Sequence, residues 1–190
     1  MKKINRFAAA LSTCMLASGA GLVAFAPASS AATASPAASH IAPPPQKPSL
    51  AERPQDSGSD GYICYDAYVQ NIGWQGWECE GYVAGTVGQS LRMEALAIVT
   101  YTTDGICAQA QVQNIGWQGW ACADDDDELL VGTEGQSLRM EAVRLAPTDG
   151  IVCADAQVQG LGWMGRLCGS DITVGTIGRS LRMEAIEITV

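Results

Sequence analysis

Histidine is nearly missing from this sequence: the one copy, His40, lies in a stretch rich in alanine, proline and serine. The region after residue 60 therefore offers no His-based triad and no histidine general base. A Cys-x-x-Cys motif is also missing, so the commonest zinc-binding patterns do not occur. We accordingly expect a protein that is not an enzyme, with no cofactor and no metal site.

Basic residues are scarce as well: 11 Lys and Arg stand against 20 Asp and Glu, a formal net charge of −9. Loss of Lys2, Lys3 and Arg6 with a cleaved N-terminus would take this charge from −9 to −12. An acidic chain lacks the electrostatic footprint for nucleic acid or an anionic membrane surface. We therefore expect neither nucleic acid nor membrane insertion after cleavage.

A long apolar stretch occurs only at the N-terminus, where three basic residues precede a run rich in alanine. This pattern predicts a signal peptide over 1–32, cut after Ala31 or Ala32, and a secreted or cell-surface protein. Residues 33–60 are rich in Ala, Pro and Ser and are predicted to form a disordered linker.

The rest of the chain repeats itself three times. An opening phrase and a closing phrase recur, with signature tryptophans 43 and 46 residues apart. Units this small must bury each other's apolar surface, so we predict one closed domain over 61–190 with repeats of about 61–103, 104–149 and 150–190. The phrases are Val69–Trp77, Val112–Trp120 and Val158–Arg166, and Gly88–Ala95, Gly135–Ala142 and Gly178–Ala185.

Six cysteines follow the predicted signal peptide, two in each repeat and always 15 residues apart. The constant separation favours pairing within repeats, although a cyclic scheme between repeats also respects the symmetry. Secretion would supply the oxidising setting that disulfides need. The expected pairs are Cys64–Cys79, Cys107–Cys122 and Cys153–Cys168.

Short segments with period-2 alternation predict strands over Ile63–Val69, Trp74–Cys79 and Ser90–Val99 and their copies. Asn71, Asn114 and Gly160 fall where a hairpin turn needs positive φ, although the turn could also lie at Gly73–Gly76. The fold class that follows is all-β: a three-repeat, pseudo-threefold β-trefoil-like domain, with a β-prism as the alternative.

Strict alternation places Leu91, Met93 and Ala95 on one face of the last strand, and Arg92, Glu94, Leu96 and Ile98 on the other. Each repeat thus has an Arg–Glu pair that either joins repeats or forms a polar recognition patch. The candidates are Arg92, Glu94, Arg139, Glu141, Arg182 and Glu184.

Two sets of tryptophans differ in how often they recur. Trp74, Trp117 and Trp163 occupy one site in every copy and are expected to pack in the core around the threefold axis. Trp77 and Trp120 occupy a second site, where the third copy has Arg166, so we expect them to be more exposed. With the neighbouring amides of Gln75 and Gln118, they are candidate ligand-binding residues for a sugar.

A run of carboxylates distinguishes the second repeat. Five oxygen-bearing side chains could hold calcium, but they lack the spacing and glycine of an EF-hand loop, so a solvated loop is the better interpretation. They are Asp124, Asp125, Asp126, Asp127 and Glu128.

The combination of Gly-Trp-Gln-Gly-Trp with Ala-Gly-Thr-Val-Gly-Gln-Ser-Leu-Arg-Met-Glu-Ala resembles the ChW repeat, the clostridial hydrophobic repeat with a hallmark tryptophan. The hallmark maps onto Trp74, Trp117 and Trp163. The resemblance implies a secreted or cell-surface protein of Gram-positive bacteria with a role in binding, adhesion or extracellular assembly. The paired cysteines and Met164-Gly-Arg166 depart from the family pattern.

Two functions remain open at this stage. One is a lectin-like, non-catalytic module that binds a glycan or cell-wall polymer. The other is an extracellular structural or protein-interaction module, for adhesion or protease inhibition, with an extracellular protein as partner.

Overall fold

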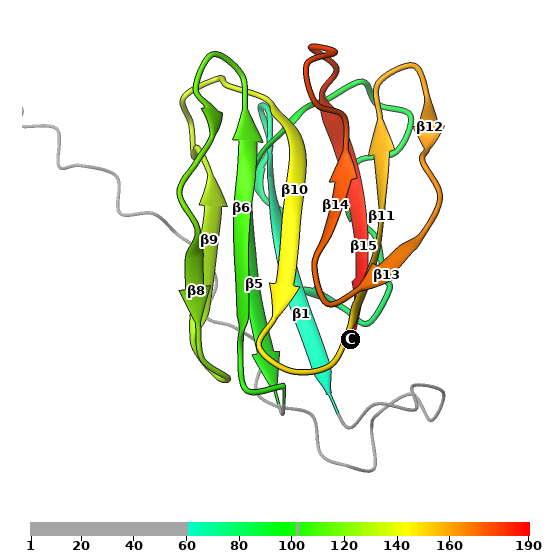
Figure 1. The fold of residues 1–190 in the computed structure, drawn as a ribbon. Coiled ribbons are helices and arrows are strands. Elements are labelled where there is room, and N and C mark those ends of the chain that lie inside the picture. The colour runs from blue at the N-terminus through cyan, green and yellow to red at the C-terminus, as the bar shows by residue number, and fades with distance from the viewer. Residues whose placement is uncertain (1–60, 102) are drawn as a thin grey trace, which may run out of the picture. The chain divides into compact units, whose positions relative to one another are not determined.

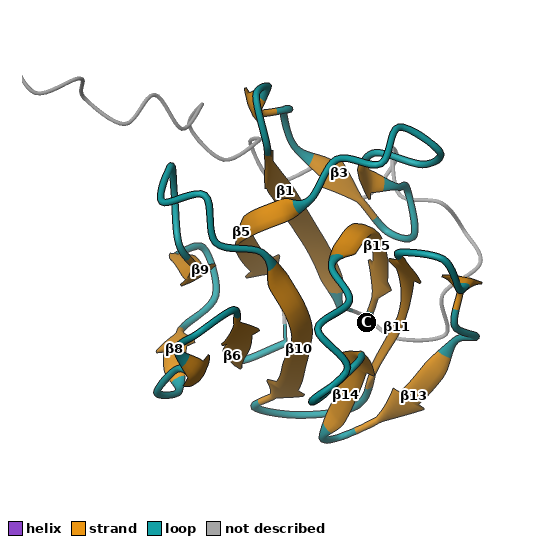
Figure 2. Cartoon of the chain, turned by 90° about the horizontal axis from the view of Figure 1, so that it is seen from above, coloured by secondary structure: helices purple, strands orange, loops and turns teal. Residues whose placement is uncertain are grey.

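The computed structural model of this protein describes residues 61–101 and 103–190, and every regular element there is a β-strand (Figure 1). The predicted signal peptide, 1–32, and linker, 33–60, lie outside the described residues. Within the described ranges, no helix is long and apolar enough to span a membrane. Three antiparallel sheets stand around one core, as Figure 2 shows from above.

Each sheet is built mainly from one repeat. The first sheet holds β1 (Tyr62–Val69), β2 (Gly73–Trp74), β3 (Glu78–Cys79), β5 (Met93–Tyr101) and β9 (Glu128–Gly132). The second sheet holds β6 (Ile106–Val112), β7 (Gly116–Trp117), β8 (Ala121–Ala123), β10 (Met140–Pro147) and β14 (Ile172–Gly175). The third sheet holds β11 (Val152–Val158), β12 (Gly162–Trp163), β13 (Leu167–Gly169), β15 (Met183–Thr189) and β4 (Ala84–Gly85).

The repeats exchange strands in a cycle. β9 of repeat 2 pairs with β5 of repeat 1, and β14 of repeat 3 pairs with β10 of repeat 2. β4 of repeat 1 then pairs with β15 of repeat 3, which closes the cycle. The prediction of an all-β, three-repeat domain is confirmed. The three sheets do not close into one barrel, and both the trefoil-like and the prism description are compatible with this arrangement.

All three repeats contribute to one shared core. The two long strands of each repeat send aliphatic side chains inward, and these side chains form a single buried cluster. Ile63, Tyr65, Ala67 and Val69 belong to this cluster, as the alternation of the first strand predicts. Burial of apolar surface between repeats is therefore the main stabilising contribution, at about 25 cal/mol per Å².

The predicted alternation along the last strand is wrong at its start. A β-bulge opposite Tyr68 and Val69 skips Glu94, because Tyr68 pairs with Ala95 and Val69 with Met93. The extra residue reverses the parity, so Met93 joins Leu96 in the core and is not on the opposite face. The strand also begins later than expected, at Met93 rather than Ser90.

The hairpin turn lies where the first of the two turn interpretations places it. Asn71 and Asn114 have φ of 64° and Gly160 has φ of 71°, as the turn requires. The return strand predicted over Trp74–Cys79 is instead split into β2 and β3. Both parts pair with β1, and the residues between them bulge away from it.

The disulfides form within repeats, as the constant spacing predicts. Cys64–Cys79, Cys107–Cys122 and Cys153–Cys168 each join the first strand of a repeat to its return strand. The paired cysteines are direct cross-strand neighbours, with Cα atoms 4.0–4.1 Å apart.

Candidate binding faces on the three sheets

We call the surface of each sheet that points away from the shared core its outer face. The alternation that sends Tyr65 and Ala67 inward leaves Cys64, Asp66 and Tyr68 on the outer face of the first sheet. The residue in the middle of this face is Asp66 in repeat 1, Gln109 in repeat 2 and Asp155 in repeat 3. Their direct neighbours on the next strand are Ala97, Arg144 and Glu187, respectively. The three faces thus have the same backbone arrangement but carry different side chains.

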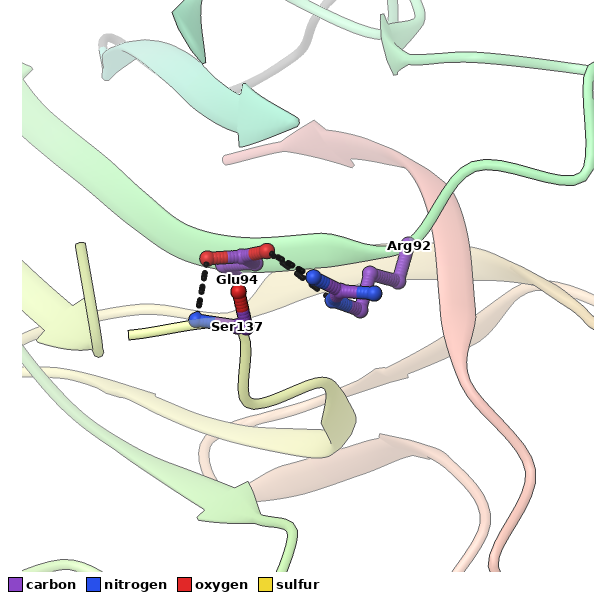
Figure 3. Close-up of polar contacts among 3 residues, drawn as sticks. All are labelled: Arg92, Glu94 and Ser137. Carbon is purple, nitrogen blue, oxygen red and sulfur yellow. Dashed lines mark hydrogen bonds and ion pairs between the residues drawn. The ribbon is translucent and has the colours of Figure 1, made fainter. Parts of the chain in front are cut away.

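The predicted Arg–Glu pairs join the repeats to each other. Arg92 forms an ion pair with Glu94 at 2.8 Å, and the amide of Ser137 in the next repeat donates to Oε2 of Glu94 at 3.1 Å (Figure 3). Glu94 is 3% exposed, so this carboxylate is enclosed in the junction. Arg139–Glu141 and Arg182–Glu184 form the same ion pair, each at 2.7 Å.

In each repeat, a Gly-Thr dipeptide packs against the backbone of the glutamate in a neighbouring repeat. Thr133 donates its amide hydrogen to the carbonyl oxygen of Glu94 at 2.7 Å, and a Cβ added to Gly132 would lie 2.4 Å from the same oxygen. A Cβ added to Gly85 would lie 2.4 Å from the carbonyl oxygen of Glu184, and one added to Gly175 would lie 2.5 Å from that of Glu141. This geometry supports the structural alternative for Arg92, Glu94, Arg139, Glu141, Arg182 and Glu184.

The hallmark tryptophans are not in the core, and that expectation is wrong. Trp117 and Trp163 are 36% and 37% exposed, and Trp74 is half-buried against Tyr68, with ring centroids 5.4 Å apart. Each lies on a two-residue strand at the edge of its sheet. Its register with the first strand directs the ring to the outer face. The core is filled by aliphatic side chains from the long strands instead.

The second tryptophan pair differs between repeats. Trp77 packs against a small outer cluster that contains Cys64, Val99 and Tyr101. Trp120 is 44% exposed, and its ring faces the guanidinium group of Arg144, with Cζ 5.1 Å from the ring centroid. Trp120 is thus the more open of the two candidates.

Sequence reasoning missed Arg144 and Asp171. Arg144 donates from Nε to Oδ1 of Asp171 at 2.7 Å and forms a second hydrogen bond to Oδ2. These hydrogen bonds lower the pKa of Asp171 and raise that of Arg144. The fork-shaped contact fixes the guanidinium group beside the indole. Because Arg144 occurs at this site in one copy only and Asp171 comes from repeat 3, no repeated motif marks them.

The two candidate glutamines lie in the loop that joins the two parts of the return strand, which we call the return loop: Gln75 between β2 and β3, and Gln118 between β7 and β8. Gln118 accepts from the amide of Gly132 at 2.8 Å and donates to its carbonyl oxygen at 3.0 Å. Gln75 accepts from the amide of Gly85 at 2.9 Å. These contacts tie the segment between β2 and β3 to β4 and the segment between β7 and β8 to β9, and they occupy the side-chain oxygen of each glutamine.

The acidic run of repeat 2 has a structural use. Asp125 accepts hydrogen bonds from the amides of Thr103, Asp104 and Gly105, at 2.8–3.2 Å, and so fixes the turn between β5 and β6. Glu128 begins β9. Among the described residues, no group of three or more His, Cys, Asp or Glu side chains is arranged to hold a metal ion.

Comparison with known proteins gives one family. No curated protein and no solved structure shows significant similarity to the chain. The model of the family described as clostridial hydrophobic W matches residues 68–100, 111–148 and 157–190, one match in each repeat. The three disulfides are consistent with an extracellular protein. The chain therefore belongs to the clostridial hydrophobic W (ChW) family, as a domain of three such repeats.

Proposed function

We propose that this domain is a secreted, non-catalytic module that binds carbohydrate or a cell-wall polymer, with its principal site on the outer face of the second sheet. The observation that carries the proposal is Trp120, an exposed indole held next to a fixed Arg144–Asp171 pair. An exposed ring can stack on the apolar face of a sugar, while the guanidinium and carboxylate groups exchange hydrogen bonds with its hydroxyls.

The charge of the domain favours a neutral glycan. Residues 61–190 contain 17 Asp and Glu and 6 Arg but no Lys, a formal charge of −11. Arg144 is the cation nearest the indole, and Asp171 offsets its charge. An anionic polymer would therefore meet repulsion from the domain as a whole and little local attraction.

Recurrence supports a surface role for the hallmark position too. Trp74, Trp117 and Trp163 lie outside the shared core, so burial in that core does not account for their presence in all three copies. Trp117 lies on the same outer face as Trp120 and would extend the aromatic platform of the second sheet.

The proposal can be tested by retention on a panel of neutral and anionic cell-wall polysaccharides. We expect Trp120→Ala to weaken binding about tenfold or more, because the variant loses the indole on which the sugar would stack. Met164→Ala is the matched control, because Met164 is also 44% exposed and lies on the return loop of repeat 3. Failure of every polysaccharide to bind, or equal binding by Trp120→Ala, would contradict the proposal.

One observation favours the second candidate, a protein-interaction module. The hairpin tips expose aliphatic side chains in all three repeats: Ile72 and Ile115 at 51% and Leu161 at 42%. Exposed aliphatic groups at repeated positions suit contact with an extracellular protein better than contact with a sugar. Inhibition of a panel of secreted proteases, lost in a triple Ile72→Ser, Ile115→Ser, Leu161→Ser variant, would support this candidate.

A further inference from the structure

The outer face of the third sheet contains a pocket. Asp155, Arg166, Glu187 and Thr189 line it, and Gly81 of repeat 1 closes one side. The pocket is small and opens to solvent, with room for a group about the size of one water molecule. It therefore lies where the first and last repeats meet, on a different face from Trp120.

One residue that lines the pocket, Arg166, stands where the other two copies have a tryptophan. Trp77 packs over the disulfide region of repeat 1, and Trp120 lies beside Arg144 on the outer face of the second sheet. Repeat 3 has Arg166 at this position, and its side chain turns to donate a hydrogen bond to Oγ1 of Thr189. Replacement of an indole by a guanidinium group thus accompanies an open pocket.

The charge in the pocket is unbalanced. Asp155 and Glu187 are direct cross-strand partners, and like charges in that position repel each other. The same pair of positions is Asp66 and Ala97 in repeat 1, so the fold does not require a second carboxylate. Arg166 is the one cation among the lining residues, which include these two carboxylates, and its charge also acts on Glu80 of repeat 1.

One oxygen of the central aspartate remains for a ligand. The amides of Met164 and Gly165 both donate to Oδ1 of Asp155, each at 3.0 Å. The equivalent Asp66 likewise takes two amides on Oδ1, and its Oδ2, buried in that repeat, has no partner. The segment between β12 and β13 thus donates these two hydrogen bonds to Oδ1 of Asp155, and Oδ2 receives no hydrogen bond from this segment.

We propose that this pocket is a second binding site, chemically distinct from the tryptophan face, which takes a primary ammonium group. Such a group is compact and presents three N–H donors to the carboxylates of Asp155 and Glu187. A quaternary ammonium fits less well, because it is usually recognised by an aromatic cage and the indole is missing here. A metal ion fits less well too, since no metal-binding cluster exists among the described residues. This proposal is independent of the glycan proposal, which concerns another sheet.

The test is an amide-resolved NMR titration of the full, oxidised chain with four small probes. D-glucosamine is compared with N-acetyl-D-glucosamine, and Nα-acetyl-lysine amide with its Nε-acetylated form. We expect saturable shifts of the Met164 and Gly165 amides with the two free amines only, weakened by added salt. The stronger of the two amines would tell whether the group belongs to an amino sugar or to a lysine side chain.

Two variants assign the effect to the pocket. Glu187→Ala introduces the residue that repeat 1 has at this position and should weaken amine binding about tenfold. Arg166→Trp restores the indole of the other repeats and should abolish binding by filling the pocket. Glu78→Ala, on the return strand of repeat 1, removes the same charge elsewhere and should change nothing.

Three results would overturn the proposal. These are equal shifts from the acetylated probes, no shift of the Met164 and Gly165 amides with either amine, and undiminished binding by a folded Glu187→Ala or Arg166→Trp variant. Preserved dispersion of the remaining amide signals shows that each variant is folded.

Discussion

The hydroxyl oxygen of Tyr65, in repeat 1, accepts a hydrogen bond from the backbone amide of Ile188, in repeat 3, at 2.9 Å. The same hydroxyl donates to the carbonyl oxygen of Tyr82 at 2.6 Å. β4 has two residues, where the exchanged strands β9 and β14 have five and four. Tyr65 therefore satisfies an amide of β15 that the shorter β4 does not reach, at the seam between the first and last repeats.

We predict that Tyr65→Phe destabilises the domain by about 1–3 kcal/mol, because it leaves the buried amide of Ile188 without an acceptor. Urea unfolding followed by tryptophan fluorescence measures the free energy of unfolding. Tyr82→Phe is the control, since the Tyr82 residue is 67% exposed and contributes only its carbonyl oxygen to this contact. Equal stability of Tyr65→Phe and wild type would show that the seam is held by other contacts.

Gly132→Ala tests the crossing of repeats at Glu94. Gly132 has φ of +93°, and an added Cβ would lie 2.4 Å from the carbonyl oxygen of Glu94. Gly165 has nearly the same φ, +97°, but no atom lies within 4 Å of an added Cβ. We expect Gly165→Ala to cost about 1–2 kcal/mol of backbone strain and Gly132→Ala clearly more, about 3 kcal/mol or above. Similar losses in thermal melting would contradict the close approach.

Strand exchange predicts that a single repeat does not fold. The first sheet needs β9 of repeat 2, and repeat 1 gives β4 to the third sheet. A peptide of residues 61–103, oxidised at Cys64 and Cys79, should therefore give a disordered circular dichroism spectrum. A cooperative melting transition of this peptide would show that the repeats are independent units.

Stability should fall as the pH rises through neutrality. Burial raises the pKa of Glu80 from 4.5 to about 7, although an amide hydrogen bond from Ile63 and the charge of Arg166 act in the opposite direction. A carboxyl whose pKa is raised on folding stabilises the fold below its unfolded pKa, and this contribution is lost as the pH passes its folded pKa. Burial likewise raises the pKa of Asp66.

After allowance for solvent screening, we expect the free energy of unfolding to drop by about 1–2 kcal/mol between pH 5 and pH 8. Glu80→Gln keeps an oxygen for the amide of Ile63 and should reduce this drop. Urea titrations at the two pH values measure both quantities. A rise in stability between pH 5 and pH 8, or the same drop in the variant, would contradict the assignment to Glu80.

Local geometry was predictable from the sequence where one residue type is needed. Positive φ at Asn71 and its two counterparts and the three cysteine pairs follow from turn chemistry and constant spacing. The position of Met93 was not predictable, because counting by twos cannot detect the extra residue at Glu94. Strand exchange was hidden too, since a strand that pairs with its own repeat has the same sequence pattern as one that pairs with the next.

The candidate site was predicted only in part. Recurrence in every copy is compatible with either a core or a surface position, and the hallmark tryptophans proved to lie on the outer faces. The weaker recurrence of the second pair indicated an exposed Trp120 correctly, but it was wrong for Trp77, which is half-buried against the small outer cluster of repeat 1. The partners that distinguish the three faces, Arg144 and Glu187, each occur in one copy only, so no repeated motif marks them.

The cyclic exchange of β4, β9 and β14 also sets what an additional repeat would require. Each repeat gives one short strand to a neighbouring sheet and receives one from the other neighbour, so no exchanged strand is left unpaired. An open solenoid gains single repeats freely, because a new unit contacts only its neighbours. Here an inserted copy would have to break one strand pairing and repack the core that all three repeats share.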